Sequence, residues 1–282
     1  MSEMVPQIDH VLVNVNDRLD EAAAHYRRLG FNLMPRGHHT VGSSNHLAIF
    51  ESDYFELLGY EPQNAERAAG LWGDVAGFAG LIMKADDAPA LARTFRERAI
   101  AMVTEEPRAL ARMVDLSDGT SQEARFSSIH LSPAITPSGM ILFCQHLTPE
   151  LVWREEWQSH PNGVRGISGI TIASRDPAKS VRLMETIYGS TSIKPIEGGL
   201  RLAARDDAID YLTPDAAMAR FGPDISLAED GADRKVAVRF RTTSRECARE
   251  VFTKADIEHE NREGEGILVR APNAFGVALM FS

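Results

Sequence analysis

A pattern of alternating apolar residues followed by an amphipathic helix occurs four times along the chain. In the first copy, Val11, Val13 and Val15 alternate with His10 and other neighbours, which is typical of a strand with one apolar face. The later copies are GLIMKADDAPALARTF, GITIASRDPAKSVRLM and VAVRFRTTSRECAREVF. A residue suited to helix N-capping precedes each helix: Asp17, Asp87, Asp176 and Ser244.

Each copy continues into further short strands, which gives the element order βαβββ. In the first copy these strands are FNLMP, HLAIF and YFELLGY. Repetition of this kind indicates an architecture of equivalent modules. One module has too few strands to bury both faces of its sheet, so two modules side by side should form a larger curved sheet with its helices outside. We therefore predict an α+β fold in which four βαβββ modules pair into two curved half-barrel domains.

The two predicted domains cover residues 1–163 and 164–282, with a boundary near Gly163 after the polar segment SHPNG. The net charge of −10 argues against binding to nucleic acid or to an anionic membrane, since both need clustered Lys and Arg. No apolar run has the length of a membrane span, and the segment MSEMVPQIDHVLV has no secretory signal pattern. We therefore predict a cytoplasmic protein in which Cys144 and Cys247 are free thiols.

Three segments carry a resemblance to a known superfamily. They are IDHVLVNVNDRLDEAAAHYRRLGF, HHTVGSSNHLAIF and YFELLGY, and FCQHLTPELVW adds support in residues 78–163. The chain resembles the vicinal oxygen chelate superfamily, which includes glyoxalase I, extradiol dioxygenases and the fosfomycin and bleomycin resistance proteins, and within it the glyoxalase-like domain group. In residues 164–282 the resemblance rests on the repeated pattern alone.

The resemblance implies a cleft formed by paired modules, in which a divalent metal ion is held by His or Gln from first strands and by Glu or Gln from last strands. It also implies a small-molecule substrate and a possible homodimer. Zn, Fe(II), Mn or Ni would suit such a site, and the sequence does not choose among them.

His10 and Glu56 are the first two candidate metal ligands. His10 lies on the strand face opposite the valines, and neutral imidazole is the commonest side-chain ligand of metal ions. Glu56 lies between Phe55 and Leu57, and a carboxylate inside an apolar strand is costly unless it is paired or metal-bound. Glu56 is also the candidate catalytic residue. The structural alternatives are a hydrogen-bonded histidine and a solvated glutamate on an edge strand.

The third ligand is sought in the last strand of the second module, ILFCQHL. An ungapped comparison places Gln145 opposite Glu56, whereas a one-residue bulge would place His146 there. Strand alternation lets only one of these neighbours face the cleft. We favour His146 as the metal ligand, because imidazole is the better donor, and keep Gln145 as a substrate-binding candidate.

Other first and last strands lack ligands at the matching positions. Ala79 or Gly80 falls opposite the first-strand histidine in the second module, Gly169 in the third and Lys235 in the fourth. Met280 stands where a ligand-bearing last strand would carry Glu, and methionine is a poor ligand for hard divalent ions. We therefore predict that the C-terminal domain is metal-free.

Further candidates for substrate binding are His39 and Asn45, in the polar segment HHTVGSSN, and His46, in a third-strand position. The alternative for this segment is a polar loop without a ligand.

Two functions remain open at this point. The first is a divalent-metal-dependent lyase, isomerase or dioxygenase that acts on a small oxygen-rich molecule in the N-terminal cleft. The second is a metal-free protein that sequesters a small molecule, as the resistance proteins of the superfamily do. Motifs for a nucleophile elbow, a phosphate-binding loop and an HExxH helix are absent from the sequence.

Overall fold

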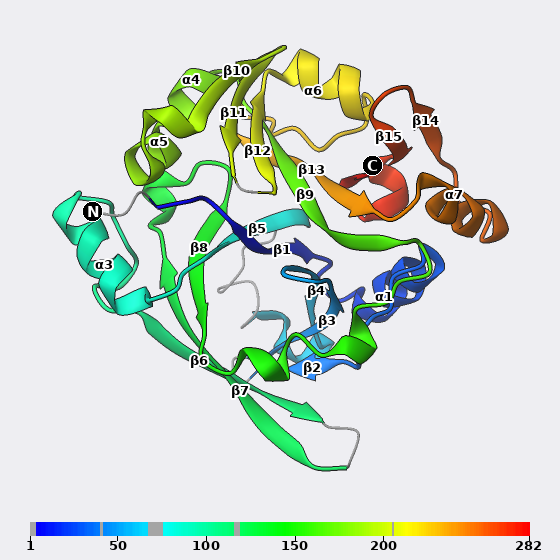
Figure 1. Cartoon of the computed structure of the whole chain (residues 1–282), viewed down its shortest axis with the longest axis horizontal. Helices are drawn as coiled ribbons and strands as arrows, with labels where there is room; N and C mark the ends of the chain where they lie inside the picture. The colour runs from blue at the N-terminus through cyan, green and yellow to red at the C-terminus, as the bar shows by residue number, and fades with distance from the viewer. Residues whose placement is uncertain (1–3, 40–41, 67–75, 116–118, 205) are drawn as a thin grey trace.

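The protein is described from a computed structural model that covers residues 4–39, 42–66, 76–115, 119–204 and 206–282. Two eight-stranded sheets make up its framework, and the helices lie on their outer sides (Figure 1). The first sheet and its helices are β1 (Ile8–Asn14), α1 (Leu19–Arg28), β2 (Gly37–His38), β3 (Ser43–Ile49), β4 (Tyr54–Tyr60), β5 (Gly77–Lys84), α3 (Ala88–Glu97), β6 (Arg108–Asp115), β7 (Ser121–His130) and β8 (Met140–His146).

The second sheet follows the same plan. Its elements are β9 (Val164–Ala173), α4 (Pro177–Ser180), α5 (Arg182–Tyr188), β10 (Ile193–Ile196), β11 (Gly199–Ala203), β12 (Ala208–Leu212), α6 (Pro214–Phe221), β13 (Arg234–Thr242), α7 (Arg245–Lys254), β14 (Glu260–Arg262), β15 (Gly266–Val269) and β16 (Ala278–Phe281).

The strand order shows that each sheet is a pair of modules. In the first sheet the order is β2-β3-β4-β1-β5-β8-β7-β6, and in the second it is β10-β11-β12-β9-β13-β16-β15-β14. The first strands of the two modules pair antiparallel at the centre of each sheet, and each first strand pairs parallel with the last strand of its own module. The predicted fold of four βαβββ modules, paired into two curved sheets, is confirmed.

Local capping explains where three of the four predicted helices begin. The side chains of Asp87, Asp176 and Ser244 each accept a hydrogen bond from a backbone N–H in the first turn of the helix that follows. The prediction for Asp17 is wrong, because α1 begins one residue later, at Leu19, without a side-chain cap.

A β-bulge in β1 determines how the candidate site is built. Ile8 pairs with Met83 of β5, and His10 pairs with the adjacent Ile82, so Asp9 is an extra residue on β1. A bulge interrupts the alternation of side chains between the two faces of a strand. As a result the neighbouring side chains of Asp9 and His10 contact each other, with 2.6 Å between Asp9 Oδ1 and His10 Nδ1.

The other first strands carry an extra residue at the matching place: Ala79 in β5, Ser168 in β9 and Val236 in β13. With the bulges aligned, His10 corresponds to Gly80, Gly169 and Ala237. The sequence comparison that set Lys235 against His10 was wrong, because it did not allow for the bulge in β13.

The register of the last strands changes a second comparison. Leu12 pairs with Glu56, and Ile82, which corresponds to Leu12 in the second module, pairs with Leu142. Leu142 therefore occupies the place of Glu56 in the second module. The sequence comparison that set Gln145 or His146 against Glu56 was wrong, because both residues lie further along β8 than Leu142, the position equivalent to Glu56.

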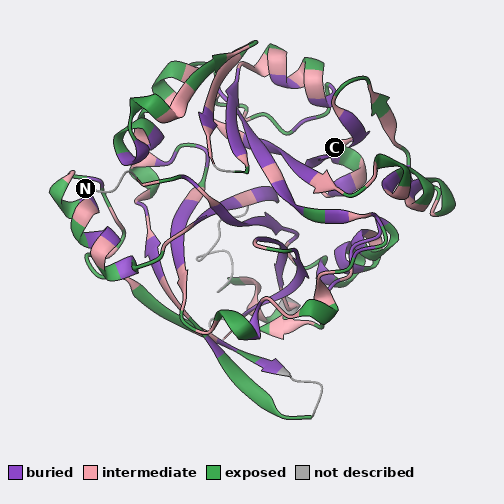
Figure 2. Ribbon diagram, in the orientation of Figure 1, coloured by how far each residue is buried: buried purple, intermediate pink, exposed green. Residues whose placement is uncertain are grey.

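The two sheets share one hydrophobic core. A single cluster of buried side chains contains residues from both sheets and from the helices that cover them. Phe240 of β13 lies at the junction, with ring centroids 5.3 Å from Phe31, 5.9 Å from Phe55 and 5.3 Å from Phe281. Figure 2 shows the same arrangement, in which central strands are buried and the outer helix faces are exposed. In the sequence the first sheet ends before residue 163 and the second begins after it, but buried side chains of both sheets pack in the same cluster.

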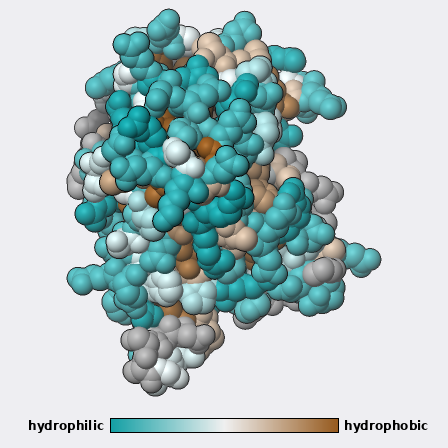
Figure 3. All heavy atoms as spheres, turned by 90° about the vertical axis from the view of Figure 1, so that its right-hand side faces the viewer, coloured by the Kyte–Doolittle hydropathy of each residue, from teal (hydrophilic) through white to brown (hydrophobic). Residues whose placement is uncertain are grey.

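The surface is mostly polar on the face shown in Figure 3, where apolar residues show only in small areas between hydrophilic ones. Within the described residues, no helix is long and apolar enough to cross a membrane. Cys144 and Cys247 are free cysteines, as predicted.

Two aspartates, the buried Asp53 and the half-buried Asp207, each accept a hydrogen bond from the backbone of the other sheet. Asp53, which precedes β4, accepts from the backbone N–H of Ile167 at 2.8 Å, and Asp207, which precedes β12, accepts from the backbone N–H of Ile8 at 2.9 Å. Burial raises the pKa of Asp53 to about 7 and that of Asp207 to about 6, although nearby cationic groups act in the opposite direction.

These raised pKa values predict that stability falls as the pH rises. An aspartate in the unfolded chain has a pKa near 4, so the folded state binds the Asp53 proton more tightly than the unfolded state does. The stabilisation from this proton is present below about pH 4 and is lost as the pH rises to about 7. Asp53→Asn keeps the acceptor oxygen without the charge, so it should raise the free energy of unfolding at about pH 8 by about 2–4 kcal/mol relative to wild type.

Denaturant titrations at about pH 5 and about pH 8 test this prediction. The benefit of Asp53→Asn should be much smaller at the lower pH, and the exposed Asp17→Asn should show no such dependence. Equal effects of Asp53→Asn at both pH values would contradict it.

Candidate functional site

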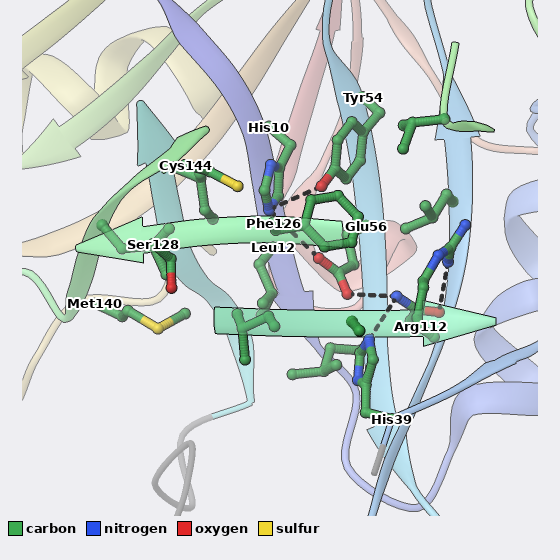
Figure 4. A pocket seen from close by; sticks show the side chains of 18 of the residues that line it. His10, Leu12, His39, Tyr54, Glu56, Arg112, Phe126, Ser128, Met140 and Cys144 are labelled. Carbon is green, nitrogen blue, oxygen red and sulfur yellow. Dashed lines mark hydrogen bonds and ion pairs between the residues drawn. The ribbon is translucent and has the colours of Figure 1, made fainter. Parts of the chain in front are cut away.

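A cavity of about 140 Å³ lies against the first sheet (Figure 4). Polar groups gather on one wall: His10, His39, Asn45, Tyr54, Glu56 and Arg112. Apolar side chains form most of the remainder: Leu12, Leu47, Leu58, Ile82, Phe126, Met140 and Leu142. A small molecule here would therefore meet polar groups on one side and hydrocarbon on the other.

His10 is held in a defined orientation. Asp9 accepts a hydrogen bond from His10 Nδ1, so in the neutral imidazole the other ring nitrogen, Nε2, carries the lone pair. His10 pairs in register with Tyr54 of β4, and the two rings stack with centroids 4.1 Å apart. Around Nε2 lie the Tyr54 hydroxyl, at 3.3 Å, and Glu56 Oε2, at 3.6 Å. Strand pairing thus brings together the two ligands that the sequence analysis favoured.

Glu56 is fixed by its neighbour on β3. The Asn45 side-chain amide donates to Glu56 Oε1 at 2.7 Å, which leaves Oε2 directed towards His10. Asn45 also lies 3.3 Å from His39 Nε2. Glu56 and Asn45 are both buried in the described structure. The carboxylate is therefore oriented before any ligand binds.

Arg112 on β6 contributes a positive charge to the same wall. Its side chain is buried, and Nη1 donates to Asn45 Oδ1 at 3.3 Å. Burial lowers the pKa of Arg112, partly offset by Tyr54 and Glu56. Because arginine stays charged in proteins, the cavity wall holds a cation next to the carboxylate of Glu56.

His146 belongs to a neighbouring group rather than to this wall. His146 Nε2 lies 3.0 Å from Asp9 Oδ1, and Asp9, Cys144 and His146 can bring one potential ligand atom each within 4.8 Å of the others. Burial would raise the pKa of Asp9, but its hydrogen bonds with the two histidines outweigh this and hold the pKa below its ordinary value. Asp9 therefore links His10 to His146 as a buried anion.

The structure divides the predicted ligand set between two groups. His10 and Glu56 face each other at the cavity, whereas His146 bonds to Asp9 and packs its ring on Trp153, with centroids 4.5 Å apart. Among the described residues, Asp9, Cys144 and His146 are the one group of three potential donors with this close spacing.

Gln145 points to the other side of β8. Its amide donates to the backbone carbonyl of Asp86 at 2.8 Å and accepts from the backbone N–H of Ala88 at 3.0 Å. Gln145 thus holds the start of α3 and does not line the cavity.

The other predicted substrate-binding residues are separated by strand alternation. His39 and Asn45 line the cavity, and burial lowers the pKa of His39. His46 faces away, and its Nδ1 lies 2.8 Å from the backbone carbonyl of Met34. His130 lines the cavity instead, and burial lowers its pKa to about 4, so its imidazole is neutral at pH 7.

Three residues of the site are not predicted by the sequence pattern: Asp9, Tyr54 and Arg112. Tyr54 could have been found, because it stands two residues before Glu56 and so shares its strand face. Asp9 gave no such signal, since only the bulge brings it beside His10.

The fold and the cavity together define a member of the vicinal oxygen chelate superfamily, with paired βαβββ modules around a polar-walled cleft. The chain belongs to the family described as "Glyoxalase-like domain", whose sequence profile matches residues 8–188. No curated protein matches the sequence.

One solved structure of similar fold covers almost the whole chain, and others match about half of it. A hypothetical protein from Staphylococcus aureus is 12% identical over 99% of both chains, with a TM-score of 0.66. A Streptomyces coelicolor methylmalonyl-CoA epimerase, in complex with 2-nitronate-propionyl-CoA, is 18% identical over 50% of this chain and 94% of its own, with a TM-score of 0.39. A hypothetical protein from Bacillus halodurans is 16% identical over 49% of this chain and 93% of its own, with a TM-score of 0.38.

Proposed function

We propose that the cavity of the first sheet is the active site of a divalent-metal-dependent isomerase or lyase that acts on a small oxygen-rich molecule. One observation carries the proposal. His10 Nε2 and Glu56 Oε2 lie 3.6 Å apart on the wall of a cavity, and each is oriented by a second residue, Asp9 for the histidine and Asn45 for the glutamate.

The donor atoms fit a divalent ion. In the neutral imidazole, Nε2 carries a lone pair towards an anionic oxygen, and a cation between the two atoms would relieve their repulsion. A carboxylate behind the histidine is the usual support of a metal-binding imidazole. His10 and Glu56 would hold the ion, and substrate or water would supply the other ligands. When bound, the ion would stabilise negative charge on a substrate oxygen.

The neighbouring group of Asp9, Cys144 and His146 suits such an ion less well. Asp9 already accepts hydrogen bonds from two imidazoles. Burial raises the pKa of the Cys144 thiol well above its ordinary value, which favours the protonated form that does not bind metals.

Glu56 would move the proton in the reaction. Oε1 is held by Asn45, so Oε2 would give up its contact with the ion when it takes a proton from the carbon next to a substrate carbonyl. The electron pair of the broken C–H bond would pass to the carbonyl oxygen, and return of the proton to a different position would complete an isomerisation. The apolar wall would keep water away from this intermediate.

A dioxygenase is a weaker candidate on this geometry. Ring cleavage by a two-His-one-carboxylate centre needs a second imidazole at the ion, and His146 is engaged with Asp9 instead. A metal-free binding protein stays as the second candidate, because Gly80 and Leu142 occupy the places that correspond to His10 and Glu56 in the second module.

Elemental analysis of protein purified without chelators tests the proposal. We expect about one divalent ion per chain in wild type and almost none in His10→Ala or Glu56→Ala, because each variant removes one of two protein ligands. His259→Ala, directly before β14 of the second sheet, is the matched control and should keep the ion.

Two outcomes would count against this function. Full occupancy in both site variants would remove His10 and Glu56 as ligands. A wild-type protein that neither contains nor takes up a divalent ion would favour the metal-free binding protein.

A further inference from the structure

We propose that Arg112 anchors the carboxylate group of a short-chain acid, which makes such acids the substrate class of this cavity. This inference rests on the proposed function for the position of the reacting carbon, but the binding of the anion follows from Arg112 itself. It concerns a ligand group that would bind beside the His10–Glu56 pair rather than at it.

Arg112 has no counter-charge within ion-pair distance among the described residues. Arg112 is 8% exposed, and no ion pair among the described residues includes it. Its Nε is buried without a hydrogen-bond partner, and Nη2 is 3.8 Å from the sulfur of Met34, which is a weak acceptor. A buried charge without a partner is costly, so a ligand that supplies the partner gains binding energy.

The same chain shows what a structural arginine at this depth looks like. Arg239, on the second sheet, is 7% exposed and forms an ion pair with the buried carboxylate of Asp210. Arg112 is buried to the same extent but has only the neutral amide of Asn45. Arg112 is also one of the residues that line the cavity, and its Nη1 bonds to Asn45, which lines the cavity as well, so an anion bound there would lie close to the guanidinium (Figure 4).

The surroundings favour a group with a single negative charge. Arg112 is the one cationic Arg or Lys side chain among the residues that line the cavity in the described structure, and Glu56 lies across Asn45 from it. A dianionic phosphate would leave negative charge uncompensated close to this carboxylate. A carboxylate matches both the charge and the planar, two-pronged geometry of a guanidinium.

The site also limits the shape of the acid. Asn45 bonds to Arg112 through its oxygen and to Glu56 through its nitrogen, so only one amide group separates the anion site from the catalytic carboxylate (Figure 4). The reacting carbon would be next to the carboxylate or one carbon further along. Leu12, Ile82 and Leu142 then leave room for a short hydrocarbon tail.

Binding of butanoate and its neutral analogue butanamide, measured by titration calorimetry, tests the inference on the whole chain. Wild type should bind butanoate about 10- to 100-fold more tightly than butanamide, because only the acid pairs with the guanidinium. Arg112→Met should abolish this preference. Arg125→Met is the matched control, since Arg125 is exposed on the adjacent strand β7, and it should keep the preference.

A second arm separates this inference from the proposed metal site. In His10→Ala, which removes a metal ligand, the preference for butanoate should persist. If His10→Ala loses the preference and Arg112→Met keeps it, the anion binds at a metal ion and the inference is wrong. Equal binding of acid and amide by wild type, no binding of either, or tighter binding of methyl phosphate would also overturn it. If Arg112→Met does not fold, the His10→Ala variant still separates the two sites, because loss of the preference there would place the anion at the metal ion and overturn the inference.

Discussion

Asp210→Asn is expected to lower the free energy of unfolding by about 3–5 kcal/mol, because it leaves the buried guanidinium of Arg239 without the one anionic partner it has among the described residues. Asp210 is fully buried on β12. Arg201 donates to its two oxygens at 2.6 and 2.8 Å, Arg220 donates at 3.2 Å, and Arg239 forms a further ion pair. Burial would raise the pKa of Asp210, but these arginines hold it below its ordinary value.

An exposed ion pair provides the control for this prediction. Glu246 pairs with Arg249 on the surface of α7, where both side chains are about half exposed. Glu246→Gln should change the free energy of unfolding by about 0.5 kcal/mol or less, since solvent screens such pairs. Both variants would be compared by urea denaturation. A loss below about 1 kcal/mol in Asp210→Asn would show that the arginines find other partners.

Phe240→Ala is expected to have an effect of similar size, about 3–5 kcal/mol, because it opens a cavity where the two sheets meet. Phe240 is fully buried, and its ring contacts Phe31, which follows α1, Phe55 of β4 and Phe281 of its own sheet. Phe240→Leu keeps most of the apolar volume and should cost about 1–2 kcal/mol.

The shape of the unfolding curve adds information on the two predicted domains, 1–163 and 164–282. Because Phe240 belongs to a core shared by both sheets, its truncation should move a single transition seen by calorimetry. A curve with two transitions, of which Phe240→Ala shifts only the second, would show that the halves fold independently.

The repeated pattern made the architecture predictable. The alternating valines of β1 and the amphipathic run of α1 return in every module, so each copy supports the assignment of the others. Capping chemistry fixed three helix starts, because Asp and Ser side chains bond the first free N–H groups wherever a helix begins.

The pairing of His10 with Glu56 was within reach of the sequence, since period-two alternation assigns both residues to the face opposite the core. Residue alternation also separated Gln145 from His146. The role of Asp9 was hidden, because a bulge places adjacent residues in contact and leaves no mark in the hydrophobic pattern.

Arg112 was hidden for a different reason. The segment RALARMVD of β6 mixes apolar and charged residues on both faces, so it does not predict a strand. Arg112 lines the cavity, where a charged side chain does not have to pack against a hydrophobic core. β6 also contacts β2, which pairs with β3, and this closure of the sheet brings Arg112 to Asn45, which lies far away in the sequence.

The extra residue in each first strand has a consequence for how this fold can change its chemistry. The backbone makes the same detour at Asp9, Ala79, Ser168 and Val236, yet only one of these four places holds an acid that supports an imidazole. In the other three modules the bulge is present, but its extra residue has no acidic side chain. Exchanging the side chain there, together with its neighbour, would install a new oriented group while both sheets keep their register.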